Sequence, residues 1–108
     1  MANVESILES IRNKFSNPDV QEKFKDVVKQ VQFEFTDVKE QYFISIDRGS
    51  AGIVKGSTDK PDVLVSTTSD ILEGIMNRKI NPVVAYSTRK IKVKGSMEDL
   101  LRLQKLML

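Results

Sequence analysis

The side chains best placed to act as nucleophiles are hydroxyls, because the 108-residue chain contains no cysteine and no histidine. The absence of histidine also removes the most common general base and the most common metal ligand. The clustered hydroxyls all lie beside expected helix or strand ends, where capping and turn formation account for Ser and Thr. They are Ser66, Thr67, Thr68, Ser69, Ser87 and Thr88. We therefore expect no enzyme activity, no metal site and no cofactor.

A second chemical feature is the run of cations in residues 77–95, NRKINPVVAYSTRKIKVKG, which contains six Lys or Arg and no Asp or Glu. The other 89 residues contain 11 Lys or Arg and 15 Asp or Glu. Lysines on the polar face of a half-buried strand explain much of this run, since they also discourage pairing at a sheet edge. A transient contact with an anionic membrane surface remains open, because it needs only loosely placed cations.

Nucleic-acid binding through residues 78–94 is a weaker alternative. Proteins that bind single strands stack bases on aromatic side chains, and the only aromatic residue of this segment is Tyr86. A nucleic-acid-binding domain is also usually basic as a whole, whereas the rest of this chain has more acids than bases. We regard nucleic acid as an unfavoured partner.

Length and composition favour one folded domain over residues 1–108, since 40% of the residues are hydrophobic and 30% are charged. No window approaches the ~20 apolar residues of a membrane-spanning helix. The first residues, MANVESILES, lack the apolar stretch of a secretory signal, and the last, QKLML, are not a peroxisomal address. We expect a cytoplasmic protein.

The apolar pattern changes from a helical period to a period of two along the chain. Helical spacing covers residues 1–16, and Asn17–Pro18 is typical of the start of a second helix, whose apolar face we expect to continue to Val31. Alternation predicts strands around 33–35, 42–46, 53–54, 63–65 and 90–94, with a hairpin turn within 47–52. Two short helices are expected at 70–77 and from Asn81–Pro82, and a capping sequence at 96–99 opens a final helix. The order predicts an α+β fold.

The final helix carries more apolar residues than one core-facing stripe requires. These residues are Leu100, Leu101, Leu103, Leu106, Met107 and Leu108. A helix packed between two layers or docked on a dimer partner would explain them, and so would a helix that lines an apolar cavity.

Several short motifs in the second half of the chain occur in a specific order. Residues 61–65 read PDVLV, 69–72 read SDIL, 78–82 read RKINP and 85–95 read AYSTRKIKVKG, and the leucine-rich helix follows. This order resembles the sterol carrier protein type two (SCP-2-like) family, which has a G-K-L-N-P-like run, then A-F-M-x-G-K-L-K-I-x-G and a leucine-rich final helix. Arg78 and Arg89 stand where the family usually has glycine, and Ser87 where it often has methionine. A functional role for the charge is thus concentrated at Arg78 and Arg89.

The resemblance implies a mixed sheet of about five strands covered by helices, with an apolar tunnel between the sheet and the helices. It also implies non-catalytic binding of a fatty acid, acyl-CoA, sterol-like molecule or phospholipid, with exchange between membranes. Because the peroxisomal tail of eukaryotic members is absent, we expect a free-standing prokaryotic type. The alternative is an interaction module of the same fold without a transported ligand, in which the C-terminal helix docks on a partner protein or on a second copy to form a homodimer.

The resemblance and the apolar pattern together give a set of candidate ligand contacts. The expected cavity lining is Phe24, Val28, Phe33, Ile75, Met76, Val83, Tyr86, Leu103, Leu106 and Met107. The expected contacts to a lipid head group or to the membrane are Arg78, Lys79, Arg89 and Lys90.

Overall fold

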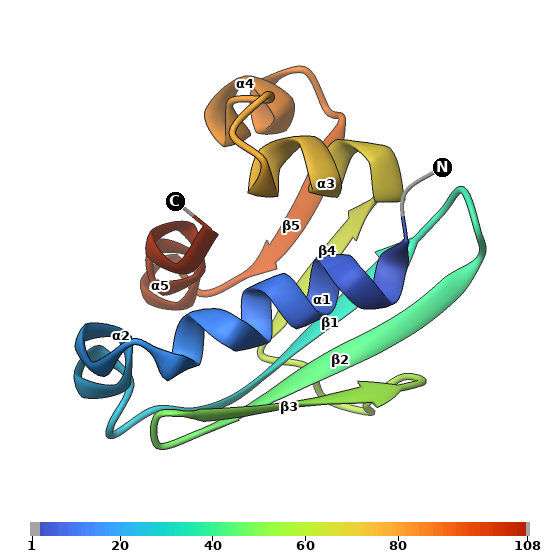
Figure 1. Cartoon of the computed structure of the whole chain (residues 1–108). Helices are drawn as coiled ribbons and strands as arrows, with labels where there is room; N and C mark the ends of the chain where they lie inside the picture. The colour runs from blue at the N-terminus through green and yellow to red at the C-terminus, as the bar shows by residue number, and fades with distance from the viewer. Residues whose placement is uncertain (1–2, 108) are drawn as a thin grey trace.

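The structure, a computed structural model, describes residues 3–107, with one sheet and a set of helices (Figure 1). In chain order the elements are α1 (Val4–Asn13), the 3₁₀ turn η1 (Lys14–Ser16), α2 (Pro18–Lys23), β1 (Val28–Phe35), β2 (Glu40–Asp47), β3 (Ser50–Lys55), β4 (Val63–Thr67), α3 (Ser69–Met76), α4 (Pro82–Ser87), β5 (Ile91–Gly95) and α5 (Met97–Met107).

The five strands form one mixed sheet in the order β3-β2-β1-β4-β5. β1 and β4 are parallel, and the other neighbouring pairs are antiparallel. The helices pack on one face of the sheet, with α1 and α3 crossing in front of the strands in Figure 1. The predicted α+β class and five-stranded mixed sheet are confirmed.

The second predicted helix was wrong in length. Asn17 caps α2 by accepting a hydrogen bond from the backbone N–H of Asp19, and Pro18 is the first helical residue. The helix ends at Lys23, however, and Val28 and Val31 belong to β1. β1 lies between β2 and β4 and pairs with β2 along its whole length, from Val28 opposite Asp47 to Phe35 opposite Glu40. The ladder hydrogen bonds to two neighbours outweigh a local helical pattern.

The strands bury their apolar residues on the face that the helices cover. Phe33 and Phe35 of β1 and Ile44 of β2 are each 1% exposed. The β2–β3 hairpin turns at Arg48 and Gly49, both with positive φ, as two-residue hairpin turns require. The opposite face is more polar, and the loop after β3 reaches it through Thr58, whose backbone N–H donates to Gln32.

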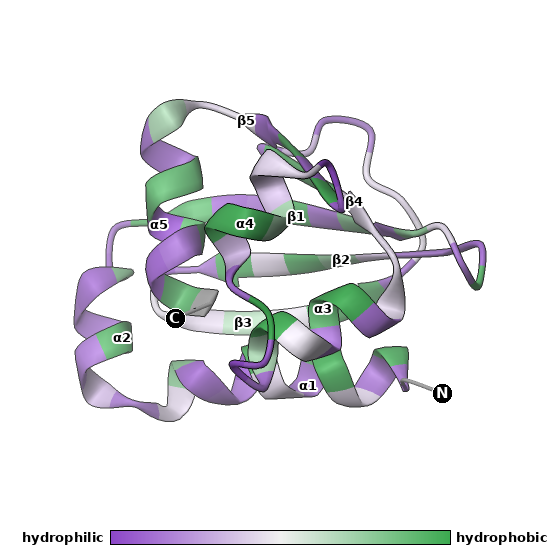
Figure 2. Ribbon diagram, turned by 90° about the horizontal axis from the view of Figure 1, so that it is seen from above, coloured by the Kyte–Doolittle hydropathy of each residue, from purple (hydrophilic) through white to green (hydrophobic). Residues whose placement is uncertain are grey.

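Side-chain caps fix the starts of the three helices in the second half. Thr68 accepts from the N–H of Ile71 at α3, Asn81 accepts from Val83 at α4, and Ser96 accepts from Asp99 at α5. Each satisfies backbone donors that a helix start leaves without partners. Figure 2 shows α4 as a mostly hydrophobic helix between α3 and α5.

Candidate functional site: an apolar pocket between helices α4 and α5

An apolar pocket of about 280 Å³ lies between β4, β5 and the last three helices. Strand residues form one side, α3 contributes one residue, and α4 and α5 form the remaining walls. The lining residues are Val65, Ile75, Pro82, Val83, Tyr86, Ile91, Val93, Met97, Leu100, Leu101, Leu103 and Gln104. The pocket contains no charged side chain, so it suits an apolar ligand and offers no acid or base for chemistry.

The alternation of β5 positions both apolar and charged residues. Ile91 and Val93 line the pocket, while Lys92 and Lys94 point to the opposite face of the sheet, because successive strand residues alternate. Pairing with β4 fixes this register, since Val93 lies opposite Val65. The lysines of this strand are therefore on the far side of the sheet from the pocket.

A second pocket of about 20 Å³, roughly the space of one water molecule, lies on the other side of α5. Its lining includes Phe24, Val31, Leu106 and Leu103. Leu103 lines both pockets, so its side chain separates them. The apolar surplus of the last helix thus has two uses, since α5 packs on the sheet and also forms the partition.

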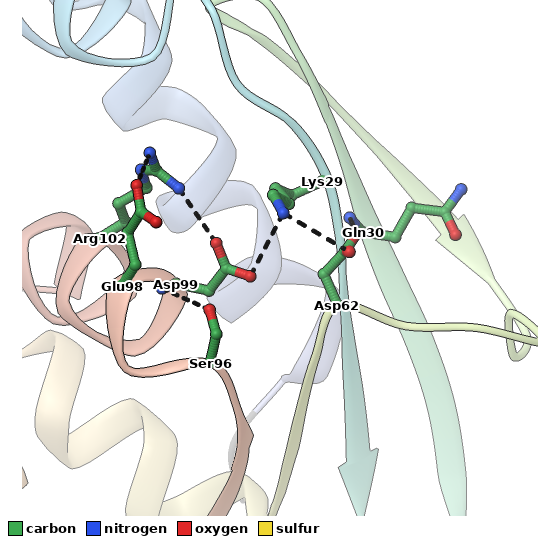
Figure 3. Close-up of polar contacts among 7 residues, drawn as sticks. All are labelled: Lys29, Gln30, Asp62, Ser96, Glu98, Asp99 and Arg102. Atoms are coloured by element: carbon green, nitrogen blue, oxygen red, sulfur yellow. Dashed lines mark hydrogen bonds and ion pairs between the residues drawn. The ribbon is translucent and has the colours of Figure 1, made fainter.

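A network of charged groups holds the first turns of α5 against β1 (Figure 3). Asp99 is 8% exposed. One of its carboxylate oxygens accepts from Arg102 at 3.1 Å, and the other lies 3.5 Å from Nζ of Lys29. Lys29 also lies 3.8 Å from Asp62, and Arg102 reaches Glu98 at 2.6 Å. The buried carboxylate of Asp99, next to the small pocket, is thus balanced by the charges of Lys29 and Arg102. Its contact with Lys29 joins α5 to β1.

The polar surroundings of α3 include a carboxylate with an altered pKa. Asp37 accepts hydrogen bonds from the side-chain hydroxyl and the backbone N–H of Ser69. The hydroxyl hydrogen bond is the main cause that lowers the pKa of Asp37. Ser69 thus joins the start of α3 to the β1–β2 turn, which is a structural role.

Three more of the clustered hydroxyls also have structural partners. Thr67 donates to the carbonyl of Lys90, and Thr88 donates to the carbonyl of Val84. Thr68 is the α3 cap described above. Within residues 3–107 no group of three or more acidic side chains is arranged to hold a metal ion. In the same range, no helix is long and apolar enough to cross a membrane.

The residues predicted to line a cavity lie in several places. Ile75, Val83, Tyr86 and Leu103 line the large pocket, and Phe24 and Leu106 line the small one. Phe33 is buried in the sheet core, Met76 is half-buried, and Val28 is 56% exposed. The side chain of Met107 lies outside the described residues.

Sequence reasoning did not select much of the large pocket, including Val65, Ile91 and Val93 on the strands and Met97, Leu100 and Leu101 on α5. Their alternation and helical spacing do indicate inward positions. That pattern cannot show whether an inward side chain meets packed atoms or open space.

Arg78 and Arg89 adopt the same unusual backbone conformation, with φ of 61° and 62°. Each directly follows the C-cap residue of a helix, α3 for Arg78 and α4 for Arg89. The N–H of Lys79 donates to Gly74 and the N–H of Lys90 donates to Ala85, which closes both helices by the Schellman pattern. That pattern places a left-handed residue, most often glycine, where the two arginines stand.

The predicted head-group residues therefore flank α4. Arg78 and Lys79 precede this helix, while Arg89 and Lys90 follow it, and all four are exposed. The pKa of the Lys14 amine is lowered by partial burial and then by the charge of Arg78. Lys14 therefore adds a further cation close to Arg78.

Comparisons with known proteins agree with this architecture. The sequence model of the SCP-2 sterol transfer family matches residues 8–108. The structure of palmitated SCP2L2 from Aedes aegypti is similar with a TM-score of 0.77 and 22% identity, over 99% of this chain and 95% of that one. Sterol carrier protein domain 2 of Helicoverpa armigera gives a TM-score of 0.79 and 18% identity, over 95% and 83%.

A curated relative is a much longer protein. Hydroxysteroid dehydrogenase-like protein 2 of Homo sapiens is 36% identical over 50 residues, which are 46% of this chain and 12% of that protein. The matching region is thus a small part of that relative.

Proposed function

The chain belongs to the SCP-2 sterol transfer family, and we propose that it binds a lipid acyl chain in the pocket between α4 and α5 without altering it. The observation that carries the proposal is the apolar pocket of about 280 Å³. This volume is near the lower end of the ~300–1,000 Å³ of small-molecule sites. It favours a ligand with one acyl chain over a ligand with two.

Hydrophobic transfer alone supplies enough free energy for such binding. Burial of a chain of ~14 carbons, at ~0.8 kcal/mol for each methylene, contributes ~11 kcal/mol before the costs of ordering the ligand. No polar anchor inside the pocket is required. The head group would lie at the mouth, where the walls of α4 and α5 are exposed at Val83, Tyr86 and Met97.

The fold supports the proposal through a relative with the same architecture. The Aedes aegypti relative is described as palmitated. We propose that this chain likewise binds a fatty acid. Exchange of the lipid between membranes follows from reversible binding and is part of the proposal.

Organic extraction of the purified protein, followed by mass spectrometry, tests whether a lipid accompanies it. A displacement assay with a fluorescent fatty acid in solution tests the pocket directly. Val93→Asp places a carboxylate in the lining, and Val54→Asp is the matched control on β3, outside both pockets. We expect the first variant to lose binding and the control to keep it. Absence of both copurifying lipid and displacement in the wild type would overturn the proposal.

Leu100→Trp is a second pocket variant, chosen because it fills the space without adding a charge. It should also abolish displacement while the chain stays folded by circular dichroism. Normal binding by a folded Leu100→Trp variant would place the ligand elsewhere.

The alternative of a dimer through α5 is favoured by one observation. Met97 and Leu101 are 72% and 51% exposed and lie four residues apart on α5, and adjacent exposed apolar side chains are typical of an interaction surface. Leu106 is 4% exposed within the domain, so a dimer would use Met97 and Leu101 instead. Sedimentation of the wild type and of Leu101→Glu distinguishes this alternative, since only a dimer would change its mass with the substitution.

A further inference from the structure

The exposed apolar side chains are concentrated on one surface, the α4–α5 face, which we define as Val83, Val84, Tyr86, Met97 and Leu101. Between residues 3 and 106, seven large apolar side chains are exposed. Five of the seven form this face, and each of the five is 51–72% exposed. All except Val84 also line the large pocket, so this face surrounds the pocket mouth. A cluster of this kind marks an interaction surface more often than isolated exposed residues do.

Cations flank the α4–α5 face. Lys79 lies in the turn before α4, Arg89 and Lys90 lie in the turn after it, and Lys105 is one helical turn beyond Leu101 on α5. Residues 77–90 contain no acid. The acids at the start of α5 are paired, Glu98 and Asp99 with Arg102.

The first two helices have no comparable excess of cations. Residues 4–25 contain four acids and four bases, and two of the acids, Glu9 and Glu22, form ion pairs with Arg12 and Lys25. A negatively charged surface would therefore be attracted more strongly to the α4–α5 face than to that side of the domain.

We propose that the α4–α5 face docks on an anionic lipid bilayer, with the apolar side chains inserted at the level of the head groups and the flanking cations on the phosphates. The proposal rests on the proposed lipid function, because docking here lets an acyl chain move between the bilayer and the pocket without crossing water. Val83, Tyr86 and Met97 would form the common wall of the pocket and the contact.

A second copy of the chain fits this face less well than a bilayer does. A two-fold contact places the same surface patch on both sides of the interface. The flanking cations would then face the same cations of the other copy, and like charges across an interface are unfavourable. An anionic bilayer complements both the apolar centre and the basic rim.

The pleat of β5 supplies a charge-matched control. Lys92 and Lys94 are opposite Ser66 and Leu64 of β4 and lie on the sheet face away from the pocket. Lys79→Glu/Arg89→Glu and Lys92→Glu/Lys94→Glu change the net charge by the same amount. Only the first pair changes the rim of the α4–α5 face.

Vesicle sedimentation tests the proposal, with phosphatidylcholine vesicles compared with vesicles that also contain phosphatidylglycerol. We expect binding to the second kind only, weakened by salt, because each cation near such a surface contributes roughly five-fold to partitioning. The affinity for the phosphatidylglycerol vesicles should fall at least roughly 30-fold in the Lys79→Glu/Arg89→Glu variant. It should fall much less in the Lys92→Glu/Lys94→Glu variant. Equal losses would show that net charge acts without a preferred face and would overturn the proposal.

Val84→Asp tests the apolar contact, since Val84 is 55% exposed and does not line the pocket. Its control is Val54→Asp, at a side chain 44% exposed on β3. We expect Val84→Asp to bind vesicles about ten-fold more weakly than the wild type, and Val54→Asp to bind them as the wild type does. Unchanged binding by Val84→Asp would refute insertion of this face.

Displacement of a fluorescent fatty acid without vesicles separates the two proposals. If docking fails and the pocket binds, the variants and the wild type bind the fatty acid equally but the wild type does not sediment with vesicles. If the pocket does not bind, displacement is absent whatever the vesicles show. A mass that doubles in solution and falls with Val84→Asp would identify a second copy as the occupant and overturn the bilayer proposal.

Discussion

Leu103→Ala should change the length of the acyl chain that the pocket prefers. The side chain of Leu103 separates the pocket of about 280 Å³ from the pocket of about 20 Å³, and alanine would join them. The added space would extend the ligand site toward Phe24 and Leu106, which line the smaller pocket.

The magnitude follows from the atoms removed. Leucine has three more carbon atoms than alanine, which leaves room for about three more methylene groups, each worth ~0.8 kcal/mol on burial. After ordering costs, up to roughly 2 kcal/mol remains, which is about 30-fold in affinity for the longer chains. A fully buried Leu→Ala change costs ~2–5 kcal/mol of unfolding free energy, and the half-buried Leu103 should cost about half of that.

The assay is displacement of one fluorescent fatty acid by unlabelled fatty acids of increasing chain length. The optimum should lengthen by about three carbons in Leu103→Ala. Leu101→Ala is the matched control on the same helix, because Leu101 lines only the large pocket and is 51% exposed. An unchanged optimum in Leu103→Ala, or an equal change in both variants, would refute the role of Leu103 as the partition.

Asp99→Asn should lower the unfolding free energy by about 1–3 kcal/mol in urea titrations, because it leaves Lys29 and Arg102 with fewer partners at a buried position; an unchanged midpoint would contradict this. Asp37→Asn should make the unfolding free energy depend less steeply on pH in the acid range. The folded pKa of Asp37 is lowered, so its contribution is complete above the unfolded pKa and is lost as pH falls through the folded pKa. Identical acid limbs for wild type and variant would be inconsistent with that role. Arg89→Gly should raise the unfolding free energy by about 1 kcal/mol, because glycine adopts the left-handed conformation without strain; a destabilised variant would show that the side chain contributes more than the strain costs.

The strands of the fold could be predicted where both local pattern and tertiary pairing favour the same structure. Tyr42, Ile44 and Ile46 alternate with polar residues, and β2 buries all three on one face. Val28 and Val31 have helical spacing after Phe24, yet both belong to β1, where Val28 pairs with β2 and Val31 pairs with both β2 and β4. The local pattern cannot contain that information, since the β4 partner of Val31 is Val63, 32 positions further along the chain.

The candidate site could be predicted only in part for a related reason. The leucine-rich sequence of α5, in which Leu103 is one of the leucines, indicates a helix that contacts more than one layer. Whether Val65 and Val93 touch packed atoms or an open pocket depends on how far α5 stands from β5. The position of α5 depends on contacts that are distant in the sequence, since Lys29 of β1 lies next to Asp99 of α5 and next to Asp62, the residue before β4.

The left-handed arginines at helix ends, Arg78 and Arg89, connect stability with the proposed membrane contact. A left-handed residue other than glycine costs roughly 1 kcal/mol, and Arg78 and Arg89 both bear that cost at helix ends where glycine would not. Strain of this kind points to a functional reason for the side chain. Both arginines lie beside α4, so glycine at position 89 would stabilise the fold and remove a cation from the rim of the α4–α5 face. The two effects have opposite signs, and Arg89→Gly should therefore unfold at a higher urea concentration and bind phosphatidylglycerol vesicles roughly five-fold more weakly. A variant that gains stability without losing vesicle binding would separate the strained conformation from the membrane contact.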